Sequence, residues 1–187
     1  MPRRSPLSLN AQKASIVSMS FALCRVVILS LLLQAAASAE EPRRGPSGLP
    51  LPRFASLAAS EVNMRKGPGF EYPVRWVYRR KGLPMLILDE ADVWRKVEDP
   101  DGEVGWIHGS RLSSRRTVMV RGKIAELRRT PSRAARVLLR AEPGVIGELA
   151  RCQPEWCLVQ FDGVRGWVER DRLWGVLPLT AQPPDAG

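Results

Sequence analysis

The chain has 187 residues, with 29 Lys and Arg against 19 Asp and Glu and a single His, so its formal net charge is +10. This length allows one or two domains. A single histidine gives little support to an enzyme that uses histidine as a general base or as a metal ligand. In a cytosolic protein, this positive charge would suggest nucleic-acid binding. The meaning of the charge therefore depends on the compartment in which the protein works.

The N-terminal segment has the pattern of a secretory signal peptide. Residues 1–20 are polar and basic without an acid, residues 26–33 are apolar, and a stretch of small residues ends at Ala39 before two glutamates. This order predicts a signal peptide over residues 1–39 with cleavage after Ala39. Met19 is an alternative start. An uncleaved membrane anchor is a further alternative, although the apolar run is shorter than the roughly 20 residues of a spanning helix.

Export predicts a periplasmic or secreted protein. Removing residues 1–39 removes four basic residues and no acid, which takes the formal net charge from +10 to +6. The remaining positive charge is spread along the chain and favours anionic envelope partners, such as cell-wall peptide carboxylates, lipid phosphates or acidic proteins. Nucleic acid is not expected as a partner, and no later apolar stretch is long enough for stable membrane insertion.

The mature chain begins with a Pro- and Gly-rich linker, residues 40–54, which is expected to be extended without a core of its own. Short apolar or alternating segments then predict β-strands near residues 74–78, 83–88, 93–98 and 104–108. Turn sequences separate them, and Asp101-Gly102 is the strongest hairpin signal because glycine accepts a positive φ. No convincing helical period occurs, so the pattern predicts an all-β sandwich or barrel. Residues 179–187 are expected to be a disordered tail.

A unit of about 60 residues occurs twice in the same order. The matching positions are Asn63-Met64-Arg65 and Glu126-Leu127-Arg128, Trp94 and Trp156, Asp101-Gly102 and Asp162-Gly163, and Gly105-Trp106-Ile107 and Gly166-Trp167-Val168. The repeat predicts two domains, residues 55–115 and residues 116–178. A unit of this size is marginal for burying a core. Closure of each sheet into a barrel and docking of the two copies would both help to stabilise the fold.

The mature chain keeps two cysteines, Cys152 and Cys157, because Cys24 leaves with the signal peptide. An even pair in an oxidising compartment predicts a disulfide, and Pro154 favours a turn that brings the two residues together. Two reduced core thiols or a metal-binding pair are the alternatives. Two cysteines without a nearby Cys or His make a poor zinc site, so no metal ligand is predicted.

Three motifs follow one another in the first unit: Asn63-Met64-Arg65-Lys66-Gly67-Pro68-Gly69, Trp94, and Gly105-Trp106-Ile107. With them the chain resembles the bacterial SH3 (SH3b) domain family, and the whole looks like a tandem periplasmic SH3-domain-containing protein. The second unit departs from the pattern, since Thr130-Pro131-Ser132 replaces Gly67-Pro68-Gly69. The resemblance implies two tandem SH3-like barrels of five or six strands each. It also implies a targeting or cell-wall-binding module of the kind often attached to peptidoglycan hydrolases.

The aromatic residues divide into two groups. Those that recur in both units are expected to have structural roles: Trp94, Trp106, Trp156 and Trp167. Those of the first unit alone lie at or after its long first loop, which lines the ligand groove of SH3-type barrels. With two nearby arginines they give the candidate groove residues Arg65, Phe70, Tyr72, Arg75, Trp76 and Tyr78, since a peptide groove needs aromatic walls and directional charges. The alternative is that these aromatics pack between the two barrels.

No catalytic constellation occurs in the sequence: there is no strained G-x-S-x-G turn, no Gly-rich phosphate loop and no free Cys with a His partner. We therefore predict no catalytic residues, no cofactor and a binding role. The partner is expected to be cell-wall peptide (peptidoglycan) or another anionic envelope component. A protein-interaction or scaffold module that docks an envelope protein is the main alternative, and an enzyme accessory subunit or degenerate hydrolase is the third. The oligomeric state is left open.

Overall fold

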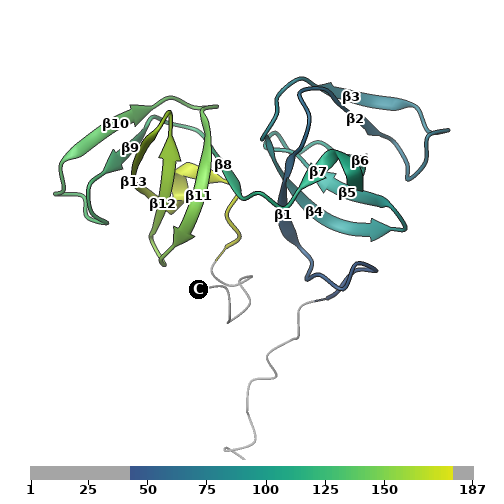
Figure 1. The fold of residues 1–187 in the computed structure, drawn as a ribbon, viewed down its shortest axis with the longest axis horizontal. Coiled ribbons are helices and arrows are strands. Elements are labelled where there is room, and N and C mark those ends of the chain that lie inside the picture. Colours follow the sequence, from purple (N-terminus) through teal and green to yellow (C-terminus); the bar gives the residue numbers. More distant parts are fainter. Residues whose placement is uncertain (1–42, 179–187) are drawn as a thin grey trace, which may run out of the picture. The chain divides into compact units, whose positions relative to one another are not determined.

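The computed structural model describes residues 43–178 (Figure 1). The expected signal peptide, residues 1–39, and the expected tail, residues 179–187, lie outside this range. The described part is built from short antiparallel strands and two short 3-10 turns. Between residues 43 and 178, no helix has the length and apolar character needed to cross a lipid bilayer.

The first unit folds into one seven-stranded antiparallel sheet with the strand order β3-β2-β6-β5-β4-β1-β7. Its strands are β1 (Arg53–Leu57), β2 (Val62–Arg65), β3 (Val74–Tyr78), β4 (Pro84–Ala91), β5 (Trp94–Glu98), β6 (Val104–His108) and β7 (Leu112–Ser113), with a 3-10 turn η1 (Gly109–Arg111) before the last. Alternation explains these strands, because every second residue faces a shared core. Fully buried members of that core are Leu57, Val62, Met64, Met85, Val97 and Ile107.

The second unit repeats the arrangement strand for strand, with the order β10-β9-β13-β12-β11-β8-β14. Its strands are β8 (Thr117–Val120), β9 (Ala125–Arg128), β10 (Val137–Ala141), β11 (Ile146–Cys152), β12 (Trp156–Phe161), β13 (Val164–Glu169) and β14 (Leu173–Trp174), with a 3-10 turn η2 (Arg170–Arg172). It has a separate core that contains Val118, Leu127, Val159, Phe161 and Val168. The prediction of two tandem all-β barrels is therefore confirmed, with short terminal strands added to the five or six expected.

The hairpin turns predicted from Asp-Gly sequences form in both units. Gly102 has φ +87°, and the two-residue turn between β12 and β13 places Asp162 at φ +47° and Gly163 at φ +77°. Positive φ at both central residues matches the right-handed twist of the flanking strands. In the first unit, the buried carboxylate of Asp99 holds the turn because Oδ1 accepts the backbone N–H groups of Asp101 and Glu103.

The N-terminal segment before β1 packs against the first barrel, in contrast to the free tether expected for residues 40–54. Leu51 is buried in the first core, and its backbone N–H donates to the carbonyl of Arg43. Ser47 donates both its backbone N–H and its hydroxyl to the carboxylate of Glu90, each at 2.8 Å. The described part of the segment therefore belongs to the first barrel, because side-chain burial and polar pairing both anchor it.

Trp174 and Thr117 of the second barrel contact the first barrel. The Trp174 indole N–H donates to the carbonyl of Pro84 at 2.9 Å, and its ring meets Phe54 edge to face at 5.2 Å between centroids. The Thr117 hydroxyl donates to the carbonyl of Gly82 at 2.7 Å. The aromatics of the predicted groove take no part in these contacts.

Candidate functional site

The first barrel has a hollow of about 330 Å³ beside the loop that joins β2 to β3. We call it the aromatic hollow. Its lining residues are Glu61, Val62, Asn63, Arg65, Phe70, Trp94, His108, Ser110 and Arg111. They come from β2 and the residue before it, from the β2–β3 loop, from the start of β5 and from the end of β6 with the η1 turn. Segments distant in sequence thus bring three rings, three charges and two short polar side chains to one place.

Phe70 is the most exposed large apolar residue of the described chain, with 70% of its surface accessible. Its ring is nevertheless held in place. It meets the buried Trp94 edge to face at 5.0 Å and stacks on His108 at 5.6 Å with an interplanar angle of 23°. The guanidinium of Arg65 lies 5.6 Å from the ring centroid, within cation–π range. The site therefore presents a positioned aromatic face beside a cation.

The β2–β3 loop is fixed by Arg65. Its Nη1 donates to the carbonyl of Phe70 at 3.1 Å and to the carbonyl of Tyr72 at 2.7 Å. Gly67 lets the loop close, because a Cβ at that position would lie 2.4 Å from the Tyr72 ring. The backbone N–H of Lys66 also donates to the carbonyl of Pro73. These contacts explain the K-G-P-G sequence as the requirement of a tight loop that carries Phe70.

His108 caps the η1 turn that follows β6. Its Nδ1 accepts the backbone N–H of Ser110 at 3.3 Å and lies 2.8 Å from the Ser110 hydroxyl. The tautomer consistent with this cap carries the ring proton on Nε2, which leaves that atom as a donor. His108 thus serves as a stacking surface and a positioned hydrogen-bond donor.

The six residues predicted for a groove separate into two sets in the structure. Arg65 and Phe70 line the aromatic hollow, and Tyr72 lies over Gly67 in the adjoining loop. The other three lie outside the hollow: Arg75, Trp76 and Tyr78. They follow the loop along β3, whose direction takes their side chains away from the site.

Two of those three residues have structural partners. Arg75 Nη2 pairs with Glu103 Oε2 at 2.6 Å. The Tyr78 hydroxyl donates to Asp99 Oδ2 at 2.9 Å, and burial followed by this hydrogen bond raises the pKa of Tyr78 well above its usual value. Tyr78 therefore remains a phenol that ties β3 to the β5–β6 hairpin. Trp76 is half exposed on β3.

The prediction missed Trp94 and His108 as members of the site. Trp94 recurs as Trp156, and the repeat correctly indicated a buried residue. It gave no sign that the Trp94 ring also contacts Phe70. His108 is the single histidine, for which the sequence indicated only the roles of general base or metal ligand. The informative signal was the repeat itself, because the second unit has Glu169 at that position and Arg133 at the position of Phe70.

The second barrel has a hollow of about 420 Å³ at the equivalent place. We call it the charged hollow, and its lining residues are Ile124, Glu126, Arg128, Arg133, Glu169 and Arg172. Arg128 Nη1 donates to the carbonyl of Ala135 at 2.7 Å, as Arg65 does to Tyr72. Arg133 Nε meets Glu169 Oε1 at 2.5 Å where the first barrel stacks Phe70 on His108. The scaffold is retained while the surface chemistry is replaced.

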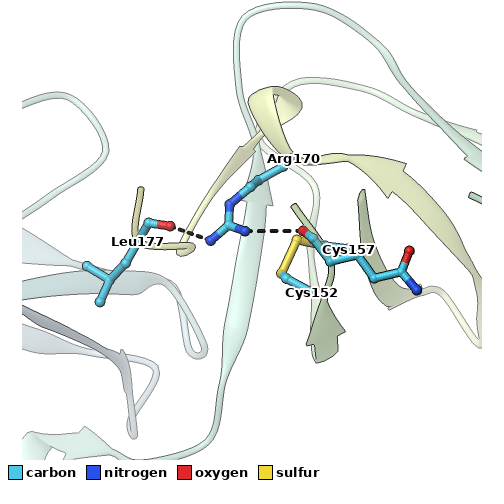
Figure 2. Close-up of a disulfide and its surroundings, with 5 residues drawn as sticks. Cys152, Cys157, Arg170 and Leu177 are labelled. Carbon is cyan, nitrogen blue, oxygen red and sulfur yellow. Dashed lines mark hydrogen bonds between the residues drawn. A yellow bond between two sulfur atoms is a disulfide. The ribbon is translucent and has the colours of Figure 1, made fainter. Parts of the chain in front are cut away.

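The predicted disulfide between Cys152 and Cys157 is present and joins the end of β11 to the start of β12 (Figure 2). Arg170 lies between this hairpin and the C-terminal segment, donating from Nη1 to the Gln153 carbonyl at 3.2 Å and from Nη2 to the Leu177 carbonyl at 2.5 Å. The cysteines therefore serve a structural purpose. Within residues 43–178, no group of three or more His, Cys, Asp or Glu side chains is arranged to hold a metal ion.

Two small barrel-like units of short antiparallel strands, each with a loop braced by an arginine after its second strand, define a tandem SH3-like barrel protein. The chain belongs to the bacterial SH3 domain family, whose model matches residues 58–114 and 121–175. No curated protein matches the chain.

Three solved structures are similar to this chain. NlpC2 from Trichomonas vaginalis is 16% identical with a TM-score of 0.31, over 66% of this chain and 48% of that one. NlpC1 from Trichomonas vaginalis is 15% identical with a TM-score of 0.32, over 70% and 48%. An NlpC/P60 family protein from Bacillus cereus ATCC 10987 is 14% identical with a TM-score of 0.30, over 65% and 55%. The matched part spans about half the length of each of these proteins.

Proposed function

We propose that this protein is an exported, non-catalytic binding protein whose first barrel recognises cell-wall peptide or another anionic envelope component through the aromatic hollow. The observation that carries the proposal is Phe70, an exposed ring that the protein holds against Trp94 and His108 beside the cation of Arg65. An aromatic ring that faces solvent, is fixed by its neighbours and has directional hydrogen-bond donors around it is typical of a peptide-binding surface.

Charge supports an anionic ligand. Arg65 and Arg111 line the aromatic hollow with a single acid, Glu61. An arginine can bind a carboxylate through two parallel hydrogen bonds, and peptide carboxylates are abundant in cell walls. Membership of the bacterial SH3 family is consistent with such a role, and the sequence resemblance implied it.

Retention on insoluble peptidoglycan tests the binding role. The mature protein should bind at low salt and be released as salt screens the arginines. Phe70→Ala should weaken retention about tenfold, equivalent to about 1.4 kcal/mol, because it removes the exposed ring. Arg133→Ala, at the equivalent place in the second barrel, is the matched control and should leave retention unchanged.

Equal retention of the Phe70→Ala variant would reject the aromatic hollow as the binding site. No retention of the unchanged protein at low salt would reject the cell-wall ligand. A single envelope protein that co-purifies at fixed stoichiometry would support the scaffold alternative instead.

Export is part of the same proposal. We infer that residues 1–39 are removed after Ala39 and that the mature chain works in the periplasm or outside the cell, where a disulfide such as Cys152–Cys157 is stable. Intact mass measurement of the protein recovered from the envelope fraction tests this. A mature chain that begins at Glu40 is expected, and a full-length chain in the cytosol would contradict it.

A further inference from the structure

The strand β3 forms one end of the first sheet (Figure 1). Among the described residues it pairs with β2 alone. An edge strand presents a row of backbone donors and acceptors to any strand that approaches it, and natural proteins usually protect such edges with charge or cover. An edge that exposes apolar side chains and little charge therefore indicates a surface that pairs with another strand.

Apolar side chains occupy the β3 edge. Val74, Trp76 and Val77 are between 41% and 50% exposed. Trp76 lies opposite the buried Met64 on β2, so its side chain is on the same face of the sheet as the core. Met64 is covered by the core, whereas Trp76 is half exposed. Val77 lies on the outer side. The edge thus offers apolar surface on both faces.

The equivalent edge of the second barrel, β10, is better protected. Arg140 occupies the position of Val77 and pairs with Glu126 at 3.1 Å. Leu139 and Ala141, which replace Trp76 and Tyr78, are partly or fully buried, and only Leu138 exposes a large apolar side chain. Each edge strand carries one paired arginine, Arg75 on β3 and Arg140 on β10, but β3 exposes three large apolar side chains where β10 exposes one.

Charges at the two ends of β3 have opposite signs. Glu71 precedes the strand, while Arg79, Arg80 and Lys81 follow it. When two copies of one strand pair antiparallel, the start of each lies beside the end of the other. Glu71 of one copy would then approach the basic residues of the second copy, on both sides of a two-fold axis.

The same charges disfavour pairing of β3 with β10. Arg136 precedes β10 and Glu142 follows it. An antiparallel β3–β10 pair would place Glu71 beside Glu142 and the basic end of β3 beside Arg136. Like charges therefore oppose the head-to-tail contact that would build open chains, and opposite charges favour the closed two-fold pair.

We propose that β3 is a self-association surface at which two copies of this chain pair antiparallel about a two-fold axis at Trp76. The two Trp76 rings meet at the axis, and Val74 of each copy lies opposite Tyr78 of the other. A five-residue edge buries less than a standard interface, so the dimer is expected to be weak and concentration-dependent. A dimer would present two aromatic hollows to a polymeric ligand.

Crosslinking tests the axis, because a residue on a two-fold axis faces its own copy. Under mild oxidation, Trp76→Cys in the mature protein should give a disulfide-linked dimer. Leu138→Cys, on the exposed face of β10, is the matched control and should stay monomeric. A monomeric Trp76→Cys, or equal crosslinking of both variants, would overturn the proposal.

Sedimentation of the unmodified mature protein tests the association without a new cysteine. From about 1 μM to about 1 mM the mean mass should rise toward twice that of one chain, the range expected for a small interface. Val77→Lys, which copies the protected edge of β10, should abolish the rise. Glu71→Lys should weaken it, and Glu71→Lys with Lys81→Glu should restore part of it.

A mass of one chain at every concentration would overturn the proposal, as would a dimer that Val77→Lys leaves intact. Retention on peptidoglycan separates this result from the binding role. Val77 lies outside the aromatic hollow, so a monomeric Val77→Lys variant keeps the intrinsic affinity of that hollow. Loss of dimerisation and loss of ligand binding are then scored independently.

Discussion

At the scale of single residues, Arg65 and Arg128 show how one side chain can be kept while its surroundings change. Each donates to a carbonyl of the loop that follows its strand. The residues on those loops differ, with Phe70 in one barrel and Arg133 in the other. The sequence motif could predict an arginine at this place, but its backbone acceptors depend on a loop conformation that no short pattern specifies.

Glu90 is a buried carboxylate of the first barrel with unusually complete pairing. Its side chain has no exposed surface and contacts Arg53 Nη2 at 2.6 Å and Arg95 Nε at 3.2 Å. Burial would raise the pKa of this carboxyl, but hydrogen bonds from Ser47 and Arg53 and the charge of Arg53 outweigh it and lower the pKa to about 2 from the ordinary 4.5. The charged form is therefore favoured by folding.

The consequence is a pH-dependent contribution to stability. A lowered pKa in the folded state means that Glu90 stabilises the fold fully above pH 4.5 and loses this contribution as the pH falls toward about 2. Glu90→Gln should cost about 2 kcal/mol at pH 7 by leaving buried arginine donors without their anion. Urea denaturation at pH 7, 4 and 2.5 measures both effects, and the difference in the free energy of unfolding between the two proteins should become smaller as the pH falls.

Glu148→Gln is the control for this measurement, because Glu148 pairs with Arg115 at the exposed surface. It should change the free energy of unfolding by less than about 0.5 kcal/mol. A Glu90→Gln variant as stable as the unchanged protein at pH 7 would contradict the stabilising role of the buried carboxylate.

At the scale of elements, the β11–β12 hairpin depends on a covalent link and on hydrogen bonds from a neighbouring turn. Cys152 and Cys157 close a loop of six residues. The backbone N–H of Gln153 donates to the Trp156 carbonyl, and Arg170 on the η2 turn donates to the Gln153 carbonyl. These hydrogen bonds thus tie the hairpin end, including Trp156, to the η2 turn.

Removing the disulfide should therefore destabilise the second barrel modestly. The Cys152→Ser, Cys157→Ser variant is expected to lose at most about 2 kcal/mol, because a short loop gains little from closure. Thermal unfolding with and without a reducing agent measures this, and the reductant should affect only the unchanged protein. Thiol titration of the unfolded mature protein should find no free thiol, and two reactive thiols would contradict the pairing.

At the scale of the whole molecule, the duplication gives two barrels with one scaffold and different hollows. The first presents Phe70 over His108, and the second places the Arg133–Glu169 ion pair there instead. Because Arg133 is already neutralised by Glu169, it has less charge available to bind an external anion. We therefore expect one ligand site per chain.

This expectation can be tested by converting the second barrel. Arg133→Phe with Glu169→His should rebuild the stacked pair beside Arg128 and raise the stoichiometry from one to two peptidoglycan fragments per chain. Isothermal titration with soluble fragments from digested peptidoglycan measures the stoichiometry. The unchanged protein serves as the reference, and a stoichiometry of two before any substitution would contradict the division of roles.

Period-two alternation, Asp-Gly turns and the internal repeat were sufficient to predict two small β-barrels, because strand faces and tight turns are properties of neighbouring residues. The even cysteine pair likewise predicted the disulfide. Only the tertiary structure decided which aromatics converge. Phe70, Trp94 and His108 are separated by long stretches of chain and meet because strand pairing brings β5, β6 and the β2–β3 loop together. Arg75 and Trp76 are close to Phe70 in sequence, yet strand β3 carries them away from the aromatic hollow.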